Sequence, residues 1–353
     1  MLIFLIVILL LAALLEGLSL RGGTSCVDAD FTLSKTRTEP DEPVELTLSV
    51  GNLSRLPITY CTVRCGFPLS VSLPEGLSVH RDLYLCTVSE LFRLWGRQRA
   101  VRTLPFSVGR RGVHTISGRE INRGDFLGLR VETGRCATRR VLMVYPRRLE
   151  SSALLEALGS YCGELTARRW LLRDPVLAMG VREYTGNEPM HTISWNQTAR
   201  RGELTVREFD YTRSLNCCVL LSVSGLTGDD ADLLDRCCGA ARTVCEALLA
   251  NGVEARLFTN AALIGFPNAA CRSVSAAPNR EEDLLDVLAR VTSAACSEAP
   301  QLAEECLNAQ SEAAAYVLIA PRADAQTDAA LRVLNARSVM GALLVAVEGL
   351  EAD

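Results

Sequence analysis

The sequence predicts an α/β domain preceded by an all-β, immunoglobulin-like sandwich and an N-terminal transmembrane helix. Three observations lead to this fold class: an unbroken apolar run at the start, short alternating runs in the first half, and strands alternating with helices in the second half. With 353 residues, 48% of them hydrophobic, the chain is long enough for two or three domains. The expected boundaries are a transmembrane helix at 1–23, a sandwich at 24–150, a connector at 151–214 and the α/β domain at 215–353.

The start of the chain predicts a membrane anchor. Leu2 to Leu15 is apolar without interruption, and apolar residues continue to Leu20. As a helix, this stretch is about 28 Å long and nearly spans the hydrocarbon core of a bilayer. Residues 1–10 contain no Lys or Arg, unlike the start of a signal peptide. Because the first positive charges follow the segment, we expect a single-pass cell-membrane protein, anchored through residues 2–20, with cytoplasmic soluble domains. A buried core helix is the alternative.

Short apolar runs between turn residues predict the sandwich. In Val44–Val50, apolar side chains occupy every second position, as in a strand with one buried face. The expected strands are 44–50, 58–65, 69–73, 101–108, 113–116 and 139–145. Their number and length fit an immunoglobulin-like module of about 110 residues.

From Leu215 onward, strands alternate with helices. The expected strands are 217–223, 254–258, 316–319 and 342–347, and the expected helices are 229–250, 281–295, 302–314 and 328–339. This alternation predicts a parallel sheet covered on both faces. In such a sheet, ligands bind at the carboxyl ends of the strands, here just after Val223.

Charge and cysteine content limit the partners and the compartment. Residues 1–150 carry 20 Arg and Lys against 14 Asp and Glu, whereas residues 151–353 carry 17 against 27. The basic half has no run of positive residues interleaved with aromatics, so we expect no nucleic-acid partner, and its charge fits anionic lipid headgroups better. Five of the 14 cysteines, Cys217, Cys218, Cys237, Cys238 and Cys245, lie in apolar runs, which predicts buried, reduced thiols.

The densest polar stretch is residues 181–209, directly before the first strand of the α/β domain. Its pattern is Arg182-Glu183-Tyr184, a turn at Asn187-Glu188, His191, Ile193-x-Trp195, Ala199-Arg200 and Val206-Arg207-Glu208. This pattern resembles the signature of the domain of unknown function 58 family, bacterial proteins that carry a von Willebrand factor A-like domain. The family has Gly-Asp in place of Asn187-Glu188 and a basic residue in place of His191.

The signature segment contains the candidate binding residues. They are Arg182, Glu183, Tyr184, Glu188, His191, Trp195, Arg200, Arg207 and Glu208. In one interpretation, a network of Arg182, Glu183, Arg200, Arg207 and Glu208 holds a ligand or partner against Trp195. In the other, the charges pair with one another and Trp195 is a packing anchor, so the segment is structural.

The chain contains no phosphate-binding loop, no dinucleotide fingerprint and no recognisable catalytic histidine motif. We therefore predict that it has no catalytic residues and is not an enzyme. A hydrolase built around His191, Glu183 and Glu188 is the alternative from the enzyme class.

The resemblance implies a Rossmann-like, von Willebrand factor A-like fold for the α/β domain. In that fold, a metal-binding loop reading Asp-x-Ser-x-Ser follows the first strand. Here the loop reads Ser222-Val-Ser224-Gly-Leu226, so a carboxylate and a hydroxyl that Mg²⁺ would need are missing. Ser222 and Ser224 are therefore predicted to form a degenerate, empty metal site, unless Asp324 completes it. No other cofactor is expected.

The resemblance also implies a function. Family members are membrane-tethered and act with ATPases of the MoxR type, so the chain is expected to be a membrane-anchored adaptor in envelope or complex assembly, with a protein partner. An outward-facing adhesion module that binds through magnesium and contains disulfides is the remaining alternative.

Overall fold

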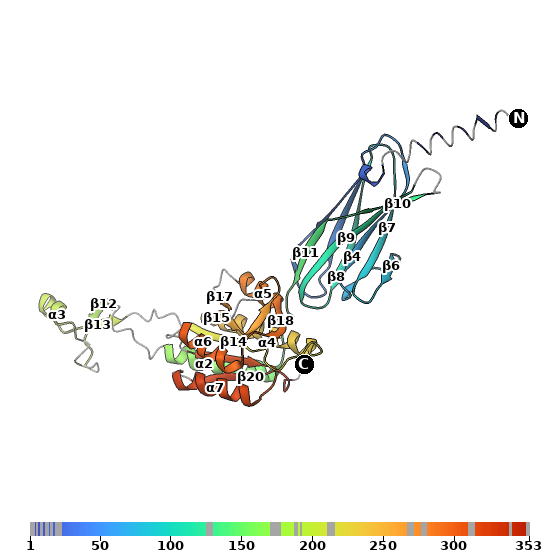
Figure 1. The fold of residues 1–353 in the computed structure, drawn as a ribbon. Helices are drawn as coiled ribbons and strands as arrows, with labels where there is room; N and C mark the ends of the chain where they lie inside the picture. The colour runs from blue at the N-terminus through green and yellow to red at the C-terminus, as the bar shows by residue number, and fades with distance from the viewer. Residues whose placement is uncertain are drawn as a thin grey trace. The chain divides into compact units, whose positions relative to one another are not determined.

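The computed structural model describes most of the chain and divides it into two compact units (Figure 1). One unit contains residues 1–147 and 288–290, and the other contains 148–287 and 291–353. The described residues are 4, 6–7, 10, 14, 17, 23–124, 130–169, 178–186, 190, 193–209, 216–266, 272–276, 281–309, 315–338 and 341–350.

The first unit is a β-sandwich. One sheet has the strand order β1-β3-β8-β5, and the other has the order β2-β11-β9-β4-β7-β6, with β10 paired to β9. The unit contains the short helix η1 (Thr24–Cys26) and strands β1 (Val27–Leu33), β2 (Arg37–Thr38), β3 (Val44–Asn52), β4 (Ile58–Phe67), β5 (Val71–Ser72), β6 (Ser78–Arg81), β7 (Cys86–Leu94), β8 (Arg99–Val108), β9 (Gly112–Gly124), β10 (Val131–Arg135) and β11 (Arg139–Val144).

The sandwich core comes from the period-2 pattern of the strands. In β3, the side chains of Val44, Leu46 and Leu48 are fully buried, whereas the alternate residues are at least partly exposed. These residues pack with inward-facing side chains of the second sheet, including Phe92 and Ile116. The alternation in the sequence therefore places one apolar face of each sheet in a shared core.

Asn52 and Gly96 hold two loops together at one end of the sandwich. The Asn52 side chain is buried, and its Nδ2 donates a hydrogen bond of 2.9 Å to the carbonyl oxygen of Trp95 in the β7–β8 loop. A Cβ at position 96 would lie 2.1 Å from the carbonyl oxygen of Arg55 in the β3–β4 loop. Only glycine therefore fits at position 96 without moving the backbone.

The second unit has a central five-stranded sheet of order β17-β15-β14-β19-β20 and a small sheet of β16 and β18. Its strands are β14 (Asn216–Leu221), β15 (Glu254–Thr259), β16 (Ala261–Leu263), β17 (Arg272–Ala276), β18 (Val291–Ala295), β19 (Ala315–Ala320) and β20 (Ala342–Ala346). Its long helices are α2 (Ser152–Arg169), α4 (Ala231–Ala250), α5 (Glu281–Arg290), α6 (Ala299–Ala309) and α7 (Ala325–Arg337).

Helices cover both faces of the central sheet (Figure 1). On one face, Cys218 and Leu220 of β14 pack in a cluster with Cys306 of α6 and Leu334 of α7. The intervening residues of β14, such as Val219, point to the opposite face, where α4 contacts the sheet. Every residue of β14 after Asn216 is buried, as expected for a strand that is covered on both sides.

The signature segment forms a separate small hairpin within this unit. Strands β12 (Ala178–Glu183) and β13 (Thr205–Phe209) pair antiparallel, and the short helix α3 (Trp195–Arg201) lies between them in the sequence. We call β12, α3 and β13 the signature hairpin.

The fold class predicted from the sequence is wrong for the von Willebrand factor A-like (Rossmann-like) domain and for the transmembrane helix, whereas the predicted β-sandwich of the first half fits the structure. Strand makes up 42% of the described residues and helix 30%, and the sandwich contributes most of the strands. The central sheet of the second unit is mixed and not parallel throughout, because β17 runs antiparallel to its neighbour β15. An antiparallel strand needs no helical crossover, and the sequence pattern of alternating elements could not reveal it.

The predicted membrane anchor is also wrong. Within the described part of the chain, no helix is long and apolar enough to cross a membrane. Most of residues 1–22 lie outside the described residues. The prediction of a single-pass membrane protein with cytoplasmic domains depended on that helix, and so did the predicted membrane contact, so both are corrected with it.

Individual elements agree more closely with the sequence pattern. Expected strands at 44–50, 58–65 and 101–108 correspond to β3, β4 and β8. The helix expected at 281–295 is too long: α5 ends at Arg290, and Val291–Ala295 is a strand that pairs with β16. The β-branched residues at 291 and 292 favour this strand over continued helix.

Candidate functional site

A polar cluster lies where β14 and β15 end. Because the two strands are parallel neighbours, the residues that follow them, Ser222 and Asn260, come together. Asn260 Oδ1 accepts from the Val223 N–H at 2.9 Å, and Asn260 Nδ2 donates to Ser224 Oγ at 2.9 Å and to the Ser297 carbonyl oxygen at 2.7 Å. Ser222 Oγ donates to Ser224 Oγ at 3.2 Å.

The hydrogen-bonding atoms of this cluster bind to neutral groups. Asn260 is fully buried and Ser222 is 1% exposed, so their polar atoms need partners within the protein. The hydrogen bonds of Asn260 use both of its donors and its acceptor, and the two serine hydroxyls bind each other. A divalent cation would need negative oxygen ligands, and the cluster supplies none.

Two acidic residues that follow β14 and β19 in the chain, Asp230 and Asp324, have structural roles. Asp230 Oδ2 accepts from the N–H and the hydroxyl of Thr227, at 2.9 and 2.7 Å, and these hydrogen bonds lower the pKa of the Asp230 carboxyl. Asp324 Oδ1 accepts from the hydroxyl and the N–H of Thr327, at 2.6 and 2.8 Å, and thereby caps α7. The hydroxyl contact is the main cause of the lowered pKa of Asp324.

The structure brings Ser222 and Ser224 together, and the sequence missed Asn260. Among the described residues, no three His, Cys, Asp or Glu side chains are grouped so that they could hold a metal ion. The degenerate metal site stays a prediction. An Asn directly after a strand that pairs with β14 was the signal for the third member of the cluster.

The signature hairpin holds several of the predicted binding residues on one small frame. Arg182 of β12 pairs with Val206 of β13, and Glu183 pairs with Thr205. Helix α3 is attached to β13, since the Thr205 N–H donates to Thr198 Oγ1 at 3.1 Å. The helix ends at Gly202, whose φ of 75° suits glycine.

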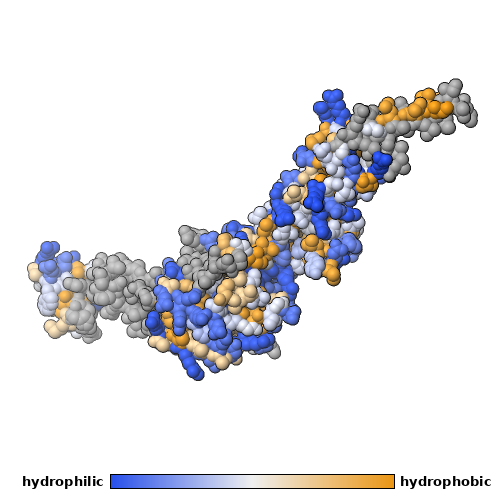
Figure 2. All heavy atoms as spheres, in the orientation of Figure 1, coloured by the Kyte–Doolittle hydropathy of each residue, from blue (hydrophilic) through white to orange (hydrophobic). Residues whose placement is uncertain are grey.

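Large apolar side chains of the signature hairpin are exposed. Ile193 and Val206 are buried, but Met190 is 71% exposed, Trp195 60% and Leu204 45%. Figure 2 shows both hydrophobic and hydrophilic residues at the surface of this hairpin. Trp195 is therefore not a buried packing anchor in the described structure.

The predicted charge network is only partly described. Arg182 donates to the carbonyl oxygen of Glu183 at 3.3 Å, and the Tyr184 hydroxyl donates to the carbonyl oxygen of Gly186 at 3.3 Å. Within the described side chains, Glu183 and Arg200 form no ion pair with each other. Glu188 and His191 lie outside the described residues, as do the side chains of Arg207 and Glu208, so the hydrolase alternative stays open there.

The described cysteines are free thiols, and most are buried. Burial raises the pKa of Cys61 to about 11 and that of Cys65 to about 12. A nucleophilic thiol needs a lowered pKa, so these two side chains act as small hydrophobic residues of the sandwich core.

No family model matches the chain. Over 231 residues it is 23% identical to the uncharacterized protein YeaD of Bacillus subtilis (strain 168), and the match covers 65% of this chain and 54% of that protein. The chain thus spans about half the length of this curated relative.

Several solved structures are similar to about a third of the chain. A cohesin module of a Clostridium perfringens family 33 glycoside hydrolase is 7% identical, with a TM-score of 0.27, over 34% of this chain and 96% of the module. A type II cohesin of Acetivibrio cellulolyticus is 13% identical, with a TM-score of 0.26, over 33% and 94%. The CARDB domain of a Pyrococcus furiosus protein is 13% identical, with a TM-score of 0.24, over 33% and 88%. Similarities of this size do not assign the chain to a family or a function.

Proposed function

We propose that the chain is a non-enzymatic adaptor that binds a protein partner through the signature hairpin. The observation that carries the proposal is the exposure of Trp195, which is 60% exposed at the start of α3. Tryptophan is enriched among residues that dominate protein interfaces, and exposing it in the free protein costs solvation energy that a partner would recover. Met190 and Leu204 add exposed apolar surface to the same hairpin.

The resemblance of the signature to the domain of unknown function 58 family supports a narrower proposal for the partner. The partner would be an ATPase of the MoxR type, and the chain would present substrates or subunits to it during envelope or complex assembly.

Binding of the purified full-length chain to a purified MoxR-type ATPase from the same source tests the proposal, with and without ATP and magnesium. Trp195→Ala should weaken binding about 30-fold, the effect of losing about 2 kcal/mol at an interface hot spot. Trp95→Ala is the matched control, because Trp95 is 74% exposed in the other unit and should leave binding unchanged. Equal binding by the wild type and Trp195→Ala would refute the role of the hairpin.

A second variant separates the adaptor from the hydrolase alternative. If the chain is an adaptor, the wild type should show no hydrolytic activity for His191→Gln to abolish. A hydrolytic activity of the wild type that disappears in His191→Gln would instead establish the enzyme.

A further inference from the structure

One side of the sandwich is open, because β1 is the edge strand of its sheet. Strand β1 pairs with β3 on one edge only. At Phe31 the opposite edge is occupied by side chains: its N–H donates to Asp30 Oδ1 at 2.8 Å, and its carbonyl oxygen accepts from Arg140 Nε at 2.8 Å. Because backbone groups alternate along a strand, those of Ala29 also point away from β3.

The second sheet is also open on this side, at the junction of β10 and β11. The Cys136 N–H donates to the Arg119 carbonyl oxygen at 3.3 Å, and the Gly118 N–H donates to the Thr138 carbonyl oxygen at 2.8 Å. Residues 136 and 138 therefore pair with β9. Arg135 pairs with Glu120 and Arg139 with Ser117, so the three residues 136–138 lie opposite only two residues of β9. Ala137 is therefore the extra residue of a β-bulge, and its N–H and carbonyl oxygen are not paired with β9.

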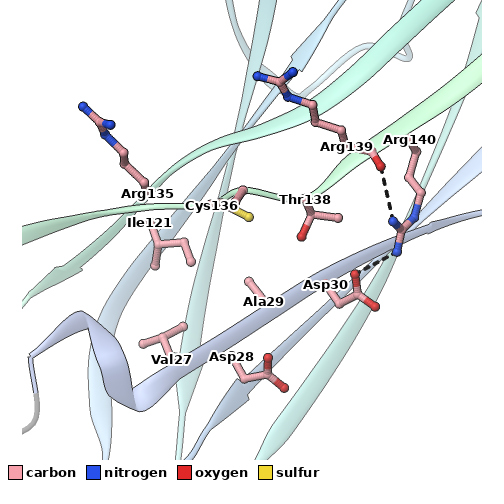
Figure 3. A pocket seen from close by; sticks show the side chains of 11 residues that line it. Val27, Asp28, Ala29, Asp30, Ile121, Arg135, Cys136, Thr138, Arg139 and Arg140 are labelled. Atoms are coloured by element: carbon pink, nitrogen blue, oxygen red, sulfur yellow. Dashed lines mark hydrogen bonds and ion pairs between the residues drawn. The ribbon is translucent and has the colours of Figure 1, made fainter.

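A groove of about 490 Å³ lies between these two open edges (Figure 3). Its apolar lining comes from Val27 and Ala29 of β1, from Ile121 of β9 and from Cys136. Arg140 crosses one end of the groove, where its Nη2 lies 3.1 Å from Asp30 Oδ1. The groove thus has a mostly polar surface with a few apolar side chains at its base, a free backbone edge and one closed end.

The charged side chains beside the groove that have no ion-pair partner among the described residues are positive. Arg135 and Arg139 are exposed, and neither side chain has an ion-pair partner among the described residues. The two acidic residues of the groove are neutralised, since Asp30 binds Arg140 and Asp28 Oδ2 lies 2.7 Å from Arg99 Nη2. Arg135, Ala137 and Arg139 alternate with buried Cys136 and half-buried Thr138, so the two arginines flank Ala137 on the outer face of the strand.

We infer that this groove binds an extended protein segment of alternating acidic and apolar residues, which adds as a strand along the β10–β11 junction. The segment would hydrogen-bond to the free N–H and carbonyl oxygen of Ala137, as in other cases of strand addition. Its apolar side chains would enter the groove, and its carboxylates would lie on the outer face beside Arg135 and Arg139. The inference does not depend on the proposed function, because the groove and the signature hairpin belong to different units.

Fluorescence anisotropy of the full-length chain with a short, fluorescein-labelled peptide of alternating Glu and Val tests this inference. Arg135→Glu/Arg139→Glu should weaken binding about tenfold or more, because two favourable charge pairs become repulsive. Arg81→Glu/Arg93→Glu makes the same charge change at two exposed positions away from the groove and should bind like the wild type. Thermal unfolding followed by circular dichroism checks that both variants fold.

Methylation of the peptide backbone provides a second test, because it would not weaken a purely electrostatic contact. Only alternate N–H groups of an added strand face the protein. We therefore compare two peptides, one methylated at every Glu nitrogen and the other at every Val nitrogen. One of the two should bind and the other should not. The inference is overturned by absence of binding, by equal loss in the two arginine variants, by equal binding of both methylated peptides, or by equal binding of a Lys and Val peptide. Binding of an oligonucleotide or an anionic vesicle in place of the acidic peptide would also overturn it.

Discussion

Asn260 shows how one neutral side chain can complete a buried polar cluster at the ends of two parallel strands. Its amide binds Val223, Ser224 and Ser297 at the ends of two strands, in the place where a sheet of this kind binds ligands. The cluster therefore joins β14 to the segment after β18 without any charge. We expect the energetic role of Asn260 to be structural.

Asn260→Ala should lower the free energy of unfolding by about 2–3 kcal/mol, because it leaves buried polar groups without partners. Asn251→Ala is the matched control: Asn251 is exposed at the end of α4 and should change stability by less than about 0.5 kcal/mol. Urea unfolding of both variants measures the difference. Equal stability of the two variants would show that the Asn260 hydrogen bonds contribute nothing net.

Asp324 gives a pH-dependent prediction. Its folded pKa is lowered by Thr327, so its carboxylate stabilises the fold above the unfolded pKa of about 3.9, and this stabilisation is lost as the pH falls through the folded pKa. Asp324→Ala should therefore cost about 1 kcal/mol at pH 7 and less at acidic pH. Urea midpoints of the wild type and the variant across this pH range measure the trend. A difference that grows as the pH falls would contradict the capping role.

At the residue scale, the sequence predicted the position of the serines but not the Asn260 amide. Ser222 and Ser224 follow a recognisable strand, so their position could be expected. Asn260 joins them only because β15 is the neighbour of β14, and strand order in a sheet is not encoded in local sequence pattern. The same limit applies to Arg135 and Arg139, whose relation to β1 depends on the packing of two sheets.

At the element scale, local patterns located about half of the described strands, but not their directions or exact ends, and they missed β1 and β7 although both contribute to the sandwich core. Strands β3, β4 and β8 were predicted because one face of each is apolar with period 2. Strand β6 was missed because all four of its residues are exposed, so it has no apolar face to detect. The direction of β17 and the end of α5 depend on pairing with β15 and β16, which are separated from them in sequence.

Gly96 supports a prediction about the two loops that it joins. Gly96→Ala should destabilise the chain by at least about 2 kcal/mol, because the new Cβ would lie 2.1 Å from the Arg55 carbonyl oxygen. Gly228→Ala introduces the same atom where no neighbour lies within 4 Å, so it should change stability by less than about 0.5 kcal/mol. Thermal unfolding distinguishes the two. Equal melting temperatures would show that the loops can move apart at little cost.

At the scale of the whole molecule, the two units differ in architecture. The two halves of the sequence also differ in charge, since residues 1–150 have more basic than acidic residues and residues 151–353 have more acidic than basic ones. The sequence predicted that a strand-rich sandwich pattern gives way to alternating strands and helices near the middle of the chain. It could not predict the fold class correctly, because a resemblance confined to short motifs does not determine how sheets are assembled. Both units use buried cysteines in their cores, such as Cys65 in one and Cys218 in the other.

This use of cysteine predicts the thiol reactivity of the native chain. Among the described cysteines, Cys296 is exposed and Cys26 is partly exposed, whereas the others are buried. Cys296→Ser should therefore remove a fast-reacting thiol from the native protein, and the buried thiols should react only after unfolding. Raising the pH to about 9 should not activate Cys65, because burial holds its pKa at about 12. Titration with a chromogenic disulfide reagent checks this, and an unchanged fast phase in Cys296→Ser would contradict it.

The open side of the sandwich has a consequence for solubility. Unpaired strand edges tend to join identical edges of neighbouring molecules, which begins aggregation. Two copies meeting along their β10–β11 junctions would bring Arg135 and Arg139 of each copy against those of the other, and the like charges would repel. Dissolved ions screen this repulsion, so concentrated salt should favour self-association of the chain, and replacing the two arginines by neutral residues should do so even in dilute buffer.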